Sequence, residues 1–130
     1  MRVNIYLKKS VPQLKKIAAK HFHKYIRERD KDKCCISCGR FTTLQAGHFY
    51  SAGKHPGLRF NEDNVHGQCV QCNYFLHGAL IEYSRNIIDR IGHERFEALK
   101  LTADVLKRMR YKWDKQFLID VIQKYKSKNG

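Results

Sequence analysis

Residues 45–73, QAGHFYSAGKHPGLRFNEDNVHGQCVQCN, combine histidines, asparagines, acidic residues and a C-x-x-C pair in one short stretch. An imidazole can accept a proton from water near neutral pH, whereas thiolates and amide oxygens can bind metal ions. Two kinds of site are therefore open. One is a structural zinc loop, which needs only the cysteines, and the other is a catalytic site built beside such a loop.

The cysteines support the zinc interpretation, because Cys35 and Cys38 form one C-x-x-C pair and Cys69 and Cys72 form another. A gap of two residues lets both thiolates of a pair converge on one tetrahedral ion. In a reducing cytosol such pairs indicate a metal site rather than disulfides. The alternative, four unrelated buried cysteines, leaves the repeated spacing unexplained. We expect a structural Zn²⁺ with no open coordination position, and we expect Cys34 to be a small buried residue or a strand residue outside it.

The charge balance points to a polyanionic partner. The chain has 130 residues with 26 Lys plus Arg against 12 Asp plus Glu, a net charge of +14. Nucleic acid is the polyanion that such a basic domain most often meets. A ribosome-associated or merely soluble basic protein is the alternative. No apolar run reaches membrane-spanning length and no secretion signal is recognisable, so we expect a cytoplasmic protein with no membrane partner.

An amphipathic helix is predicted from Ser10, which can cap it in a capping box with Gln13. Its apolar stripe consists of Val11, Leu14, Ile17, Ala18, Phe22, Tyr25 and Ile26. The lysines on its other faces could contact phosphate or simply be solvated.

Residues 34–68 lose the helical period and contain several glycines, which favours a hairpin around TLQAGHFY followed by an irregular loop through residues 51–59. The helical pattern resumes near Cys69, is stopped by Gly92, continues in HERFEALKL and ends in a helix capped by Asp114. The core positions expected in these segments are Leu80, Ile81, Ile87, Ile88, Ile91, Phe117, Leu118, Val121, Ile122 and Tyr125. Five aromatic residues are expected in the core around the hairpin: Phe49, Tyr50, Phe60, Tyr74 and Phe75.

The predicted fold class is thus α+β, in a single domain of residues 1–130. It divides into an N-terminal helical segment, residues 1–31, a zinc-stapled core, residues 32–79, and C-terminal helices, residues 80–130.

The motifs also resemble a known family. NVHGQCVQCN has the form N-[LV]-x-x-x-C-x-x-C-[HN] and resembles the second half of HNH (ββα-metal, His-Me finger) nucleases, while CISCGR…AGHF resembles the first half. More closely, YIRERD, CISCG, AGHF, LRFNEDN, QCVQCN and RIG, in this order, resemble the phage NinG (Rap) recombination protein family. The resemblance implies an HNH-like core and a structure-specific endonuclease that hydrolyses branched DNA, such as Holliday junctions and D-loops, with the help of a metal ion.

The resemblance assigns roles to individual residues. His48 falls at the position of the general base, which takes a proton from the attacking water. Asn64 falls at the middle position, where its amide can pin the His48 loop by bonding backbone across the hairpin. Asn73 takes the place of the final histidine and resembles the metal-binding asparagine of endonuclease VII, which implies a catalytic Mg²⁺ or Mn²⁺. His77 would share a helical face with Asn73 and could be a second ligand or a solvated residue.

Gly47 departs from the family pattern, because many HNH enzymes carry an Asp or His metal ligand just before the base. Glu62, Asp63, His55 and His66 are nearby candidates for the missing ligand, and the sequence does not choose among them. Arg59 and Lys54 could bind DNA phosphate or anchor the basic, glycine-rich loop.

Three functions remain open at this stage. The first is an endonuclease that acts on branched DNA in phage recombination, in the host cytoplasm and with a homodimer as one conceivable assembly. The second is a non-catalytic, zinc-stapled nucleic-acid-binding module. The third is an HNH nuclease of the restriction or homing type that cuts linear duplex. The module does not explain His48, Asn64 and Asn73 at HNH spacing.

Overall fold

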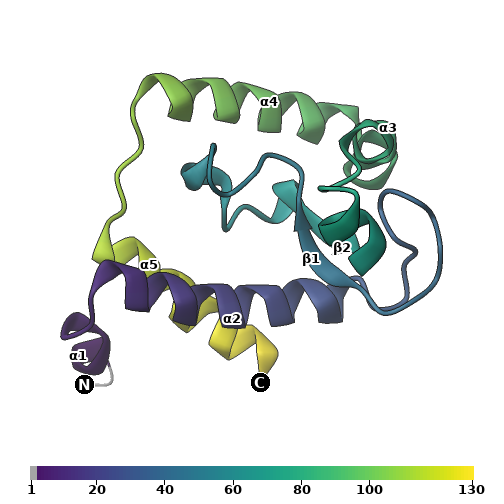
Figure 1. Cartoon of the computed structure of the whole chain (residues 1–130). Helices are drawn as coiled ribbons and strands as arrows, with labels where there is room; N and C mark the ends of the chain where they lie inside the picture. The colour runs from purple at the N-terminus through teal and green to yellow at the C-terminus, as the bar shows by residue number, and fades with distance from the viewer. Residues whose placement is uncertain (1–2) are drawn as a thin grey trace. The chain divides into compact units, whose positions relative to one another are not determined.

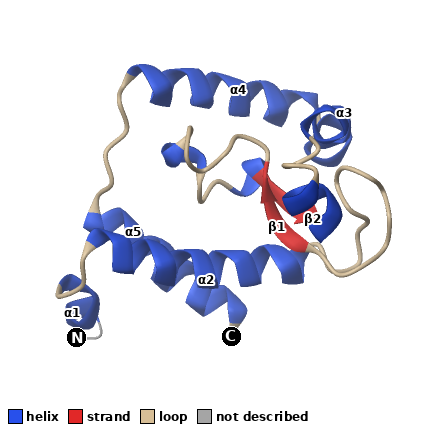
Figure 2. Cartoon of the chain, in the orientation of Figure 1, coloured by secondary structure: helices blue, strands red, loops and turns tan. Residues whose placement is uncertain are grey.

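The computed structural model describes residues 3–130, apart from the side chains of residues 3 and 4. Residues 1–2, with which the predicted N-terminal segment begins, lie outside the described residues. Two compact units are present: a terminal unit made of Met1–Tyr25 with Lys112–Gly130, and a central unit, Ile26–Tyr111. Helices and one small sheet coexist, which confirms the α+β class (Figures 1 and 2). None of the helices within residues 3–130 has the length and apolar character needed to cross a membrane.

The terminal unit contains α1 (Val3–Leu7), the larger part of α2 (Val11–Arg29) and α5 (Lys115–Asn129). The predicted capping box of α2 is confirmed. The backbone N–H of Ser10 donates to Gln13 Oε1 at 2.8 Å, and the backbone N–H of Gln13 donates to Ser10 Oγ at 3.3 Å. These bonds satisfy N–H groups that a helix start otherwise leaves without partners.

Apolar side chains of α2 and α5 form the core of this unit. Phe22 meets Tyr125 edge to face, with ring centroids 4.9 Å apart. Asp114 caps α5 as predicted, since its carboxylate accepts from the backbone N–H of Gln116 at 3.3 Å. One core position was wrong: Phe117 is 40% exposed, whereas its neighbour-but-one Ile119 is fully buried. The buried stripe of α5 is therefore rotated slightly from the predicted one.

The sheet of the central unit has two strands. β1 (Gln45–His48) pairs antiparallel with β2 (Val65–Gln68), with Gln45 opposite Gln68 and His48 opposite Val65. The strand expected within TLQAGHFY is present, but its partner begins only at Val65. The connection is consequently a loop of residues 49–64, longer than the predicted one, and it contains the two 3₁₀ turns η1 (Pro56–Leu58) and η2 (Glu62–Asn64). No pattern in the sequence marks this register, because it depends on contacts across the loop.

Helical structure follows β2. A single π-helical turn, η3 (Gln71–Phe75), leads to α3 (Leu80–Ile91) and α4 (His93–Arg108). Gly92 ends α3 as predicted and has φ +91°, a left-handed value that suits glycine. α4 extends beyond the predicted HERFEALKL segment.

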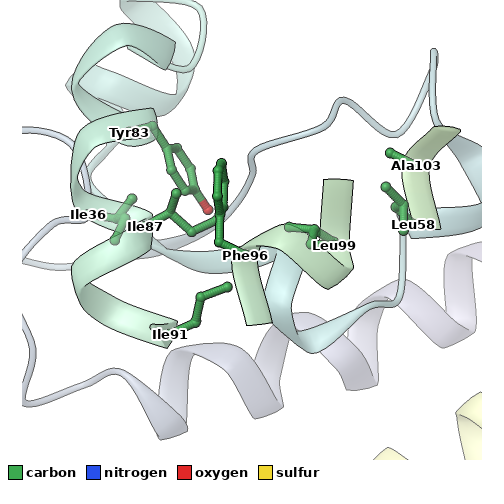
Figure 3. Close-up of a cluster of buried hydrophobic side chains, with 8 residues drawn as sticks. All are labelled: Ile36, Leu58, Tyr83, Ile87, Ile91, Phe96, Leu99 and Ala103. Atoms are coloured by element: carbon green, nitrogen blue, oxygen red, sulfur yellow. The ribbon is translucent and has the colours of Figure 1, made fainter. Parts of the chain in front are cut away.

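The main core of the central unit joins α3 and α4 to the first cysteine loop and to the loop of residues 49–64 (Figure 3). Its members are Ile36, Leu58, Tyr83, Ile87, Ile91, Phe96, Leu99 and Ala103. Phe49 and Tyr50 pack against this core, as expected.

Four predicted core positions are wrong. Tyr74 and Phe75 are 70% and 60% exposed, and Leu80 and Ile81 are 48% and 69% exposed. The predicted helical pattern continued through residues 76–79. In the structure the backbone leaves the helix at these residues, and a new helix, α3, begins at Leu80. Burial on α3 therefore begins at Tyr83.

A buried carboxylate connects the end of α2 to the sheet within the central unit. Asp30 accepts a hydrogen bond from the backbone N–H of Gly67 at 2.8 Å and from the guanidinium of Arg29 at 2.8 and 2.9 Å. Arg29 also donates to the carbonyls of Glu62, at 3.1 Å, and of Val65, at 2.7 Å. Burial opposes ionisation of Asp30, but the bonds from Arg29 and Gly67 outweigh it and lower its pKa to about 2. The carboxylate is therefore charged at neutral pH and fixes the position of β2.

Candidate metal centre and candidate active site

Cys35, Cys38, Cys69 and Cys72 come together in the central unit, and their sulfur atoms all lie within 4.8 Å of one another. The Sγ atoms of Cys38 and Cys69 are 3.7 Å apart. Four thiolates around Zn²⁺ at about 2.3 Å would have sulfurs about 3.8 Å apart. The cluster is therefore compatible with zinc, and Cys34 is not part of it.

The loop that carries the first cysteine pair is held from several sides. The backbone N–H of Cys69 donates to Cys35 Sγ at 3.3 Å. Asn86 of α3 donates to the carbonyls of Ile36, at 2.8 Å, and Ser37, at 3.2 Å. These contacts attach the cluster to the hydrophobic core rather than leaving it on a free loop.

Arg40 adds positive charge beside the sulfurs. Its guanidinium donates to Cys38 Sγ at 3.5 Å and to Cys69 Sγ at 3.6 Å. Burial of Cys38 favours its thiol, but the N–H donors of Arg40 outweigh burial and lower the pKa of Cys38 to about 6. A thiolate at neutral pH is the form that binds zinc.

His48, the last residue of β1, lines a separate cavity of about 210 Å³. The other lining residues are Phe49, Ser51, Ala52, Asn73, His77, Gly78 and Leu80. Three of the residues that the family resemblance singles out, His48, Asn73 and His77, thus share one cavity although they lie on different segments.

The protonation state of His48 follows from its hydrogen bond. Nε2 lies 3.0 Å from the backbone carbonyl of Arg59. Because a carbonyl can only accept, Nε2 carries the proton, and in the neutral ring the lone pair is then on Nδ1. Burial lowers the pKa of His48 below its ordinary 6.5, in spite of the bond to Arg59. The ring is therefore neutral at pH 7, with Nδ1 able to accept a proton.

Asn64 fastens the loop that follows His48. It is fully buried, and its Oδ1 accepts from the backbone N–H of Tyr50 at 2.8 Å. Its Nδ2 donates to the carbonyls of Tyr50, at 3.0 Å, and Leu58, at 3.2 Å. The side chain thus bonds backbone across the loop of residues 49–64 and does not line the His48 cavity.

Asn73 and His77 reach the cavity in different ways. Asn73 lies in η3, and its Nδ2 donates to Gln45 Oε1 at 2.9 Å, which orients the amide. His77 was expected to share a helical face with Asn73, and that expectation is wrong. His77, Gly78 and Ala79 have φ values of +52°, +97° and +41°, a left-handed turn that side-chain-bearing residues rarely adopt.

Hydrogen bonds hold this strained turn in place. Gln68 Nε2 donates to the carbonyl of Gly78 at 2.6 Å, and Ser37 Oγ donates to the carbonyl of Ala79 at 3.3 Å. The backbone N–H of Gly78 donates to the carbonyl of Cys72 at 2.8 Å. The turn that carries His77 is therefore bonded directly to the second cysteine pair.

The glycine at position 47 has a steric reason. A Cβ on Gly47 would lie 2.8 Å from Cβ and 2.9 Å from Cδ of Gln68, and it would overlap Oε1. Gln68 is fully buried and its Nε2 is bonded to Ser37 Oγ at 2.8 Å as well as to Gly78, so it cannot move aside freely. Gln68 thus fills the space that a metal-binding side chain at position 47 would need. Sequence reasoning gave Gln68 no role although it opens the QCVQCN motif, because its packing against Gly47 depends on the pairing of β1 with β2.

The alternative ligand candidates have other partners. His66 donates from Nε2 to the carbonyl of Asp63 at 2.9 Å and accepts from Arg29 at Nδ1, 3.2 Å away. The Asp63 carboxylate pairs with the guanidinium of Arg95. Neither these residues nor Glu62 and His55 line the His48 cavity.

The two predicted phosphate-binding residues are separated. Arg59 is half-buried and contributes its backbone carbonyl to His48, whereas Lys54 is exposed and lines a different cavity of the central unit. The phosphate roles of both residues remain predictions.

Comparison with known sequences decides the family. The profile described as "Bacteriophage Lambda NinG protein" matches residues 1–129. The chain belongs to the NinG family. Three NinG relatives show how far the similarity reaches. Protein ninG of Escherichia phage lambda is 47% identical over 78 residues, which cover 58% of this chain and 38% of the relative. Protein ninG of Escherichia phage 933W is 39% identical over 106 residues, covering 80% and 50%, and that of Salmonella phage P22 is 50% identical over 70 residues, covering 52% and 34%.

The matched region is at most about half the length of these NinG proteins. No solved structure matches the chain. Membership of the NinG family is thus established by sequence, while the roles of His48, Asn64, Asn73 and His77 depend on the chemistry of the cavity.

Proposed function

We propose that this NinG-family chain is a metal-dependent endonuclease of the HNH type that hydrolyses branched DNA. The observation that carries the proposal is the His48 cavity. A neutral imidazole with its lone pair on Nδ1 shares this cavity with an amide and a second imidazole that can bind a metal ion. The net charge of +14 supports nucleic acid as the substrate.

Asn73 and His77 line the same cavity and are the candidate ligands for a divalent ion. Nδ2 of Asn73 is engaged by Gln45, so its Oδ1 is the atom of the amide that can act as a ligand, and Mg²⁺ or Mn²⁺ accepts such an oxygen. When bound there, the ion would polarise the scissile phosphate and stabilise the leaving oxygen. Two protein ligands leave several positions for water and phosphate, in contrast to the closed cysteine cluster.

His48 performs the proton transfer in this proposal. Its Nδ1 takes one proton from a water molecule as the water oxygen forms a bond to phosphorus. The bond from phosphorus to the 3′ oxygen breaks, and that oxygen takes a proton from solvent. The hydrogen bond from Nε2 to the Arg59 carbonyl keeps the ring oriented and stabilises the imidazolium that forms. Asn64 acts indirectly, by holding the loop that contains Arg59.

The substrate class is proposed from the resemblance to the NinG family. Cleavage in phage recombination, in the host cytoplasm, is the corresponding biological setting.

The test compares wild type with His48→Ala on labelled four-way junction, D-loop and linear duplex DNA, with Mg²⁺, with Mn²⁺ and without added metal. Loss of the general base should reduce cleavage of branched DNA by about 10²- to 10⁴-fold, while zinc content and melting temperature stay unchanged. His93→Ala is the matched control, since His93 is exposed and does not line the cavity. Equal cleavage by His48→Ala, or no cleavage by folded wild type with either metal, would contradict catalysis and favour a binding module. Preference for linear duplex would favour a restriction or homing nuclease.

A further inference from the structure

A second cavity in the central unit, of about 260 Å³, lies between the loop of residues 49–64 and the end of α4. Leu58 and Ala103 form part of its floor and belong to the buried core, 1% and 3% exposed, where they lie side by side at one end of the cluster (Figure 3). Leu106 and Tyr111 add further apolar surface. The interior of the cavity is thus suited to a flat or apolar group rather than to a hydrated ion.

The rim of this cavity is cationic. Lys54, Lys107 and Arg110 line it, and none of its described lining residues is acidic. The pKa of His55, which also lines the cavity, is lowered by partial burial and by the charges of Lys107 and Lys54. The two lysines are therefore close enough to act on one group, although they come from different elements. The surroundings favour an anion at the rim.

Hydrogen bonds and close packing hold the walls of the cavity in place. The backbone N–H of His55 donates to the carbonyl of Ser51 at 2.8 Å, and that of Leu58 donates to the carbonyl of His55 at 3.0 Å. A Cβ on Gly57 would lie 2.7 Å from Leu106 Cδ1, so the loop packs closely on α4. Arg110 has φ +52°, a left-handed value rarely adopted by residues other than glycine. The shape of the cavity is consequently set by the fold rather than by the exposed side chains alone.

The cavity also lies near the His48 site along the chain. Ala52 lines the His48 cavity and Lys54 lines this one, and only Gly53 separates them. Two residues span at most about 7 Å. A strand of B-DNA advances about 3.4 Å per nucleotide, so residues this close can contact nucleotides of one strand that are a few positions apart.

We propose that this second cavity binds a single unpaired nucleotide of the DNA strand, next to the strand position cleaved at His48. The base lies against the apolar floor, and its phosphate is bound by Lys54, Lys107 and Arg110. A bare phosphate would leave the apolar floor unused, and a purely apolar ligand would leave the cations without a counterion. A paired base cannot enter, because its plane is stacked between neighbours in the duplex, whereas branch points supply unpaired or readily extruded bases. The inference rests on the DNA-binding part of the proposed function and gives it a source of selectivity for branches.

The experiment measures binding in the His48→Ala background without added Mg²⁺ or Mn²⁺, so that cleavage does not enter the result. The probe is a four-way junction with one unpaired 2-aminopurine at the branch, and the reference is a fully paired duplex of the same length. Lys107→Gln should weaken binding of the junction about five- to tenfold and reduce its salt dependence by the equivalent of about one phosphate contact. Arg108→Gln is the matched control, because it removes one charge from the next residue of α4, which does not line the cavity. It should affect junction and duplex to the same small extent.

A second variant separates shape from charge. Leu106→Phe adds volume to the cavity without changing charge, and it should abolish the fluorescence change of 2-aminopurine while duplex binding is retained. The proposal is overturned if Arg108→Gln weakens junction binding as much as Lys107→Gln, or if the fluorescence of 2-aminopurine is unaffected by binding of the otherwise unchanged protein. If the expected binding results are found but wild type cleaves no DNA, the nucleotide site stands and the catalytic proposal fails.

Discussion

The four-cysteine cluster and the His48 cavity lie in the same unit and are held by the same strand, β2, but they are built differently. Each cysteine pair is local in sequence, and the four sulfurs converge within 4.8 Å. The cavity instead collects His48 from a strand end, Asn73 from a π-helical turn and His77 from a left-handed turn. A site whose ligands come in short repeated spacings is specified locally, whereas the cavity is specified by hydrogen bonds between distant segments.

We expect the cavity to depend on the cluster more than the cluster depends on the cavity, because four bonds to one metal ion hold the cluster more strongly than single hydrogen bonds hold the cavity. The turn that carries His77 is bonded to the carbonyl of Cys72, and Gln68, which also holds that turn, immediately precedes Cys69. Loss of the cluster should therefore remove the cavity, whereas changes in the cavity should leave the cluster intact.

Cys72→Ser is the substitution with the largest expected effect on both regions. A structural zinc site contributes about 10–16 kcal/mol of apparent binding free energy to folding, which exceeds the stability of a small domain. The variant should lose zinc, and the central unit should be unfolded at 25 °C, with loss of any cleavage. Metal analysis together with a circular dichroism melt measures both effects.

Cys34→Ser is the control, because Cys34 lies outside the cluster. It should keep one zinc per chain and change the melting temperature little. Retained zinc with an unchanged melt in Cys72→Ser would show that the four-cysteine assignment is wrong.

Lowering the pH gives a second test, in which the expected loss of folding stability is smaller. Burial is the main cause that lowers the pKa of His66 to about 4, from 6.5 in the unfolded chain. The His66 side chain therefore binds a proton below pH 6.5 in the unfolded chain, but only below about pH 4 in the folded chain. The contribution of neutral His66 to the free energy of unfolding is fully present above pH 6.5. It is lost as the pH falls to about 4, and the loss amounts to about 3 kcal/mol. Denaturant unfolding in the presence of excess Zn²⁺, at pH values from 8 to 5, measures the slope.

His66→Gln isolates this contribution, since an amide can still donate to the Asp63 carbonyl and accept from Arg29 but does not titrate in this range. The variant should show a flatter dependence of unfolding free energy on pH. Any slope that it retains belongs to other groups whose pKa is shifted in the folded chain, among them His48, His55 and the cysteines of the cluster. An identical slope in wild type and variant would mean that His66 is not the group responsible.

The mildest test concerns the cavity alone. Gly47→Ala places a Cβ against Gln68 in a packed interior and should cost about 1–3 kcal/mol of stability, without loss of zinc. Gly53→Ala is the matched control, because a Cβ there meets no atom within 4 Å, and it should change stability by less than about 0.5 kcal/mol. Equal melting temperatures for both variants would mean that Gln68 yields without cost.

The sequence predicted those features that depend on neighbouring residues. The cysteine pairs, the Ser10–Gln13 capping box, the Asp114 cap and the stop at Gly92 are each set by a few consecutive residues. They were predicted because spacing and side-chain chemistry suffice there.

Features set by distant contacts escaped prediction. The partner strand of β1 begins at Val65, beyond a loop that is fixed by Asn64. Tyr74 and Phe75 are exposed because the backbone turns sharply after them, and no periodicity in the sequence marks that turn. Asp30 ends the YIRERD motif, but nothing in that motif shows that its carboxylate is buried and positions β2.

The contact between Gly47 and Gln68 has a consequence for how sequences of this kind can diverge. The side chain at either position can grow only into space that the other side chain leaves free. We therefore expect the residues at positions 47 and 68 to change together. In this chain a glycine faces a buried glutamine that secures the turn of His77. A larger residue at the first position would require a small one at the second, and the turn would need a different support. Deep mutational scanning of this pair should therefore show strong epistasis. Single substitutions at either position should be destabilising, whereas a double substitution that keeps the combined volume should be tolerated.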